Sequence, residues 1–240
     1  MSNHNRYEKI YPKSRSKWTE ISKARGIETK GAMTRFYARF AMAQGFRGVV
    51  FEGYSPSSVR GYGALLKLQL AYSALDVFVK AANLVETQLR VPKKAIYEYR
   101  LIDSHLASQL KDCHQLVAYL MEMCSSVEIV RRMHLFVGDV HPIAENSTLT
   151  EKLNNCRRQL EAQGKEVALV DGDVLFIAAS LRHGVAHGDM SLHSVGVEKS
   201  SVVKLVESLA QRVLELAERE FDLLVENVGL QPVKFATSIE

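Results

Sequence analysis

Residues 181–189 read LRHGVAHGD and hold the side chains with the clearest chemical potential in this chain of 240 residues. Arg182 is a permanent, fork-shaped cation that matches the geometry of a phosphate group. His183 and His187 can accept or donate a proton near neutral pH. The stretch therefore predicts a catalytic or phosphate-binding surface, and the alternative is an ordinary solvated helix face.

A metal site is a second interpretation of the same residues. His183 and His187 are four residues apart, as in a zinc-binding helix, and Asp189 or His193 could complete a set of ligands. Position 184 is glycine, however, so the glutamate base of the HExxH pattern is missing. Because a bare HxxxH recurs by chance in helices, we expect neither a metal nor another cofactor.

The helix that must position these side chains runs from about Val174 to His187. An aspartate at 171 or 173 can cap its start, and Gly188 can adopt the left-handed conformation just past its end. At 3.6 residues per turn its apolar residues form one stripe that should face the core: Val174, Ile177, Ala178, Leu181 and Val185. Arg182 and both histidines fall on the other side, where Gly184 and Ala186 leave room for another helix or a substrate backbone.

The rest of the chain predicts an all-α, multi-helix bundle. Punctuation by glycine, proline and capping residues places helices at about 58–90, 96–124, 131–137, 148–164, 174–187 and 198–228. Residues 46–54 and 192–197 could form short strands. We divide the chain into a basic, partly helical N-terminal extension, residues 1–50, and a helical bundle, residues 51–240.

The most apolar segment, residues 64–85, raises the question of a membrane span. Its polar residues recur at spacings of four and three and define one helix face: Gln69, Ser73, Asp76, Lys80 and Asn83. A charge in mid-membrane costs about 2.5–3.5 kcal/mol on insertion scales, so we expect a helix of a soluble bundle and no membrane contact. The absence of an apolar leader and the three unpatterned cysteines point to the cytoplasm.

Positive charge is concentrated in the N-terminal fifth of the chain. Residues 1–50 contain 11 lysines and arginines against three acidic residues, although the whole chain carries only +4. Such a segment could contact RNA phosphates and stack on bases, through Lys13, Arg15, Lys17, Trp18, Lys23 and Arg25. The alternative is a solvated extension without a nucleic-acid role.

This stretch resembles the Arg-X4-6-His signature of HEPN domains (higher eukaryotes and prokaryotes nucleotide-binding), because Arg182 is followed by a polar residue at 183, then by His187 and Gly188. The resemblance covers about residues 57–228, and that family is also an all-α bundle with the motif on a late helix. The long early helix adds Asp76, where many members carry an acid. An ordinary i,i+4 pair with Lys80 explains Asp76 equally well.

The resemblance implies a metal-independent endoribonuclease in which two motifs of a homodimer converge on one site. His187 would take the proton from the ribose 2′-hydroxyl, and Arg182 would stabilise the phosphoryl oxygens, leaving 2′,3′-cyclic phosphate and 5′-hydroxyl ends. His183 would orient the phosphate or protonate the leaving oxygen. The family context implies toxin or antiviral defence and an antitoxin or regulatory partner.

Two alternatives stay open at this stage. The chain could be a non-catalytic HEPN-like module that binds RNA, nucleotide or a protein partner, in which case binding weakens as salt rises while RNA stays intact. It could also be a structural helical interaction protein with no affinity for RNA.

Overall fold

The computed structural model describes residues 10–89 and 199–230, together with residues 109, 113, 116, 177, 178, 181, 182, 185 and 196. Four helices form this part: α2 (Arg15–Ala24), α3 (Ala32–Gly45), α4 (Pro56–Leu89) and α10 (Ser200–Leu230). The described residues contain no strand. The all-α prediction is confirmed for this part of the chain.

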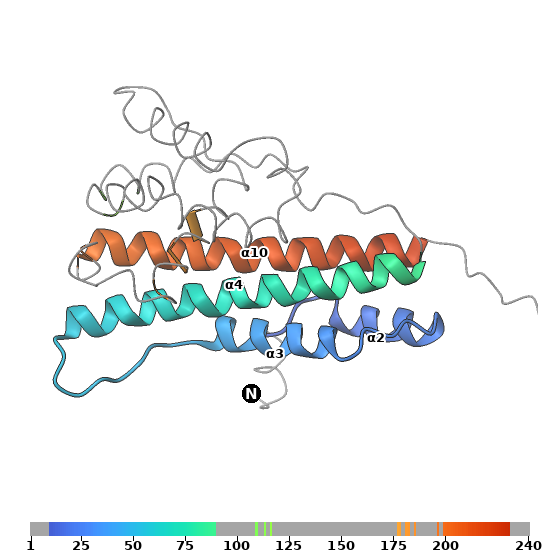
Figure 1. The fold of residues 1–240 in the computed structure, drawn as a ribbon, viewed down its shortest axis with the longest axis horizontal. Coiled ribbons are helices and arrows are strands. Elements are labelled where there is room, and N and C mark those ends of the chain that lie inside the picture. The colour runs from blue at the N-terminus through green and yellow to red at the C-terminus, as the bar shows by residue number, and fades with distance from the viewer. Residues whose placement is uncertain are drawn as a thin grey trace, which may run out of the picture.

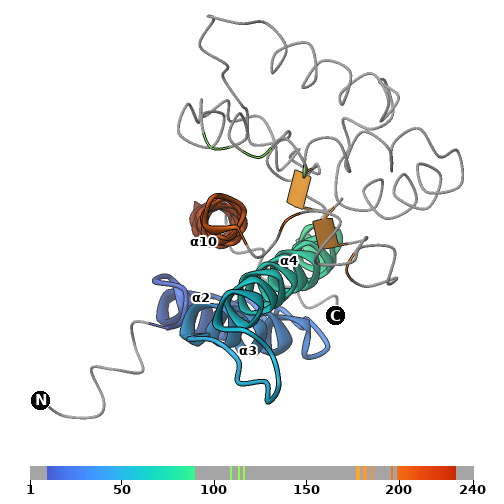
Figure 2. The same ribbon diagram turned by 90° about the vertical axis from the view of Figure 1, so that its left-hand side faces the viewer.

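Helices α4 and α10 are the two long elements, and they lie side by side along the length of the molecule (Figure 1). In the end-on view α4 lies between α10 and α3 (Figure 2). Helix α3 runs antiparallel to α4, since Glu28 just before α3 bonds with Gln88, while Arg39 within it bonds with Ser73. Helix α3 therefore covers one side of α4.

Helix α2 packs along α10. The backbone amide of Lys13 donates to Glu218 at 3.2 Å, and the Arg25 guanidinium donates to the carbonyl of Gly229 at 3.2 Å. These two contacts at the ends of α2 show that it runs parallel to α10.

The core is centred on aromatic rings from all four helices. Phe221 of α10 has ring centroids within 6.3 Å of Trp18, Phe36 and Phe78. All four side chains are at most 4% exposed. Aromatic pairs at these separations add to the stabilisation from burial, so this cluster joins α2, α3, α4 and α10 into one unit.

The two long helices agree with the predicted ones at 58–90 and 198–228, with both ends of each within two residues. The last helix buries one face against the core: Val202, Val206, Leu209, Val213 and Leu216. The N-terminal extension is partly helical, and residues 15–45 contribute Trp18, Phe36 and Phe40 to the same core as α4 and α10.

The predicted strand at 46–54 is wrong, because this segment is the loop between α3 and α4. Gly48 and Gly53 have φ angles of 136° and 79°, which turn the chain away from an extended path. Val50 is 92% exposed and has no neighbouring strand to complete a ladder. Of the second predicted strand, 192–197, only Gly196 is described, and it lies in a turn with φ 63°.

Most of the predicted helices at 96–124, 131–137 and 148–164 lie outside the described residues. Cys113 is 2% exposed, and Leu116, three residues on, is fully buried. Within the described part of the chain, no helix has the length and apolar character needed to cross a membrane.

Candidate functional site

Arg182 lies on a helical segment whose apolar stripe faces the core, as predicted. Ile177, Ala178 and Leu181 are at most 3% exposed, and Val185 packs against the same core. The Arg182 side chain is only partly buried and extends to α4, where its Cζ atom lies 5.1 Å from the centroid of the Tyr72 ring. This distance is within the range of a cation–π interaction. The polar side of the motif helix thus meets another helix of the same chain.

Asp76 lies one turn after Tyr72 on α4, and both residues act electrostatically on Arg182. Burial lowers the pKa of the Arg182 guanidinium below its usual value, while Tyr72 and Asp76 raise it and Arg39 lowers it. Arg182 contacts Tyr72 and Arg39 contacts Ser73, the next residue of α4, so we group Arg39, Tyr72, Asp76 and Arg182 and call them the arginine–aspartate cluster. It joins the two positions, 76 and 182, that the HEPN resemblance selects.

The Asp76 carboxylate has a local partner as well. Its Oδ2 atom lies 3.1 Å from the Nζ atom of Lys80, one turn further along α4. The Asp76 side chain is 16% exposed and that of Lys80 is 65% exposed. The predicted i,i+4 pair therefore exists, and Asp76 also lies one turn from Tyr72, the ring that Arg182 contacts.

Arg39 is a member of the cluster that the sequence did not identify. From α3, its Nη1 atom donates to the Ser73 hydroxyl oxygen at 2.6 Å and lies 3.5 Å from the Ser73 carbonyl oxygen. Both contacts cross from one helix to the next. The sequence contains one signal, the polar stripe on α4. It indicates that Ser73 faces polar surroundings, but it does not identify Arg39 as the residue that contacts Ser73.

The arrangement follows from the helical spacing of α4. Relative to Tyr72, the polar residues Asp76 and Ser73 lie about 40° and 100° round the helix, and Gln69 and Lys80 fall between them. Arg182 approaches from the Tyr72 side and Arg39 from the Ser73 side. The polar stripe is thus bordered by one arginine on each side, an arrangement suited to an anionic ligand.

Other residues of the predicted site cannot be placed. His183 and His187 lie outside the described residues, as do Asp189 and His193, the additional ligands of the metal alternative. In the described part of the chain, no three His, Cys, Asp or Glu side chains are grouped as metal ligands would be.

The predicted RNA-binding residues of the N-terminal segment divide into two kinds. Lys13, Arg15, Lys17 and Lys23 are exposed, and Arg25 is partly buried against the end of α10. Trp18 is 4% exposed and packs on Phe221. The prediction that Trp18 stacks on bases is corrected, because its apolar ring is more stable in the core than in water.

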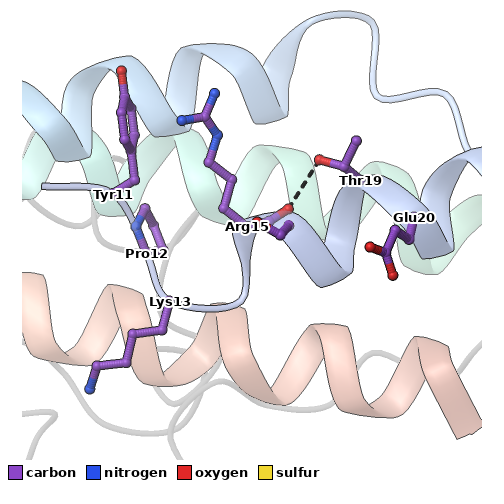
Figure 3. A pocket seen from close by; sticks show the side chains of 7 residues that line it. Tyr11, Pro12, Lys13, Arg15, Thr19 and Glu20 are labelled. Atoms are coloured by element: carbon purple, nitrogen blue, oxygen red, sulfur yellow. Dashed lines mark hydrogen bonds between the residues drawn. The ribbon is translucent and has the colours of Figure 1, made fainter. Parts of the chain in front are cut away.

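A cavity of about 710 Å³ opens at the start of α2, and Figure 3 shows its lining. Arg15 and Tyr11 point the same way, with the Arg15 guanidinium 4.0 Å from the Tyr11 ring centroid, while Lys13 extends across α10. Glu20 adds a negative charge to the same lining. The mixed charge and the stacked pair make this cavity a weaker candidate than the arginine–aspartate cluster.

No protein-family model, no curated protein and no solved structure matches this chain.

Proposed function

We propose that this protein is a metal-independent endoribonuclease of the HEPN type. The observation that carries the proposal is the arginine–aspartate cluster, in which Arg182 lies over the Tyr72 ring of α4, one helical turn from Asp76. A random match to a short motif would not require its arginine to face the acid of a helix more than 100 positions earlier. The cluster therefore supports the resemblance on a point independent of the motif itself.

Each residue has a definite task in this mechanism. Arg182 would bind the scissile phosphate and stabilise the charge that builds on its oxygens. Asp76 would hold the guanidinium in place and favour its charged form, and it touches no reacting atom. His187 would take the proton from the 2′-hydroxyl, which then attacks the adjacent phosphorus, and His183 would assist the phosphate or the leaving oxygen.

A homodimer would complete the site by bringing two copies of the motif together, because a self-complementary face is the usual route to twofold pairs. Such an enzyme would act in the cytoplasm, and toxin or antiviral defence with a neutralising partner is the biological setting that the resemblance suggests.

The test is cleavage of end-labelled single-stranded and structured RNA by the full chain in EDTA. We expect wild type to yield 2′,3′-cyclic phosphate and 5′-hydroxyl ends and to leave DNA of the same sequence intact. His187→Ala should abolish cleavage and Arg182→Ala should slow it by about 100-fold or more, whereas Arg35→Ala, which removes an exposed arginine of α3, should not. Cleavage that survives His187→Ala would rule the proposal out.

The same samples decide for the non-catalytic alternative. If RNA stays intact in every sample but wild type still retards it on a gel, Arg182 serves binding alone. That binding should weaken steeply with added salt, because phosphate contacts release counterions.

A further inference from the structure

Three aromatic rings form an exposed cluster at the start of α4. Phe51 and Tyr54 come from the loop before the helix, Tyr62 comes from its second turn, and the three ring centroids are 5.6–5.9 Å apart. Phe51 is 43% exposed and Tyr54 57% exposed. Rings that pack on one another at the surface, outside the core, indicate a site for a partner with an apolar or aromatic face.

The cluster lies on the same face of α4 as the polar stripe. Tyr62 is within about 40° of Asp76 round the helix, and the two residues are 14 positions apart, about 21 Å along the helix axis. Along this line lies Ser73, which holds the Arg39 guanidinium. Along this face of α4 the aromatic rings come first, Arg39 follows, and the other members of the arginine–aspartate cluster come last.

The surrounding charge favours a polyanion on this face. Three cations, Arg39, Lys80 and Arg182, lie along this face beside the acid Asp76. Successive bases of a single strand stack on exposed rings while cations contact its backbone, and this combination does not depend on sequence. A duplex cannot use the rings, because its bases are already stacked on one another.

We propose that this face of α4 is a track for single-stranded RNA, in which Phe51, Tyr54 and Tyr62 stack on unpaired bases a few nucleotides from the bond that is cut. Arg39 contacts a phosphate between the rings and Arg182. This inference rests on the proposed function and names its substrate class, RNA that is unpaired next to the cleavage point.

The test measures affinity separately from cleavage. The His187→Ala chain, with and without Tyr54→Ala, is titrated with one fluorescently labelled RNA as a single strand and as a duplex. Tyr54→Ala should weaken binding of the single strand at least about fivefold and leave the duplex unchanged. Tyr54→Phe should keep the affinity, because it keeps the ring. Met42→Ala is the matched control, since it removes an equally exposed apolar side chain (58%) from α3.

The outcomes separate the two proposals. Equal affinity of the Tyr54→Ala and parent chains for the single strand would overturn the inference, as would an equal loss for both RNAs. A change of molecular mass in Tyr54→Ala, measured by sedimentation, would also overturn it and make the rings a protein interface. A ring-dependent affinity with no cleavage by wild type would support the track and refute the nuclease.

Discussion

Helices α4 and α10 are nearly equal in length, 34 and 31 residues, and lie side by side, yet their polar faces are organised differently. On α10, Gln211 and Arg212 both contact Glu215, and Arg219 pairs with its neighbour Glu220, all within the helix. The contacts that α10 receives from α2 are a backbone amide on Glu218 and an arginine on the Gly229 carbonyl. On α4, Ser73 receives Arg39 from α3, and Tyr72 receives Arg182 from the motif helix. Both arginines come from other helices.

The two helices also differ in charge. The α10 range contains three basic against six acidic side chains, whereas α4 contains three basic against two acidic ones. Ion pairs within one helix, such as Arg212–Glu215, contribute only a few tenths of a kcal/mol. Side chains held from two other helices are fixed in place, which binding and catalysis require. The comparison therefore supports α4 as the location of the candidate site, with α10 packed beside it.

The largest expected effect is on the scaffold. Phe221→Ala should lower the free energy of unfolding by about 3–5 kcal/mol, because it leaves a cavity among Trp18, Phe36, Tyr37 and Phe78. Urea unfolding followed by circular dichroism measures the change. A loss below about 1 kcal/mol would show that this ring cluster does not hold the helices together.

Arg182→Ala should reduce the rate of RNA cleavage about 100-fold or more, because it removes the group that stabilises the phosphoryl oxygens. Arg212→Ala, a matched change of a partly buried arginine on α10, should leave the rate within about twofold when the two proteins are equally folded. Equal losses in the two variants would remove the distinction between α4 and α10.

The tyrosines give the scaffold a dependence on alkaline pH. Burial raises the pKa of Tyr37 above its ordinary value of 10.0, against a smaller lowering by Arg15, and burial also raises that of Tyr72. Above about pH 10 the unfolded chain loses these protons first, so the stabilisation present at lower pH is lost as pH rises. Urea unfolding between pH 8 and pH 11 should show the decline.

Tyr37→Phe should make that decline shallower without weakening the protein at pH 7. The Tyr37 hydroxyl oxygen is buried with no hydrogen-bond partner among the described residues, so its removal should be neutral or stabilising by up to about 1 kcal/mol. A clear loss of stability at pH 7 would show that the hydroxyl has a partner.

The smallest effect is expected on the surface of α10. Glu215→Ala removes the partner of Gln211 and Arg212 and should cost only a few tenths of a kcal/mol. Unfolding in parallel with wild type checks this value. A cost above about 1 kcal/mol would show that the Glu215 contacts contribute substantially to the stability of the fold.

Sequence patterns predicted α4 and α10 because glycine, proline and capping residues mark their ends, and the polar residues at 69–83 keep a helical spacing; both signals depend only on local sequence. They also predicted the apolar stripe at 177–185 and selected Asp76 and Arg182. They did not predict Arg39 or the burial of Trp18, since both depend on which helix packs beside which. Residues 46–54 have a composition typical of a strand but form a loop, because the positive φ angles of Gly48 and Gly53 outweigh the β propensity of their neighbours.

The central claim is that Asp76 and Arg182 act as one site on the face of α4. Its most direct test is a double-mutant cycle on the single-turnover rate of RNA cleavage in EDTA, with Asp76→Asn, Arg182→Ala and the combined variant. If Asp76 acts through Arg182, the combined variant should be no slower than Arg182→Ala alone. If the rate losses of the two single variants multiply in the combined variant, or if the wild-type chain leaves RNA uncut, Asp76 and Arg182 do not act as one site.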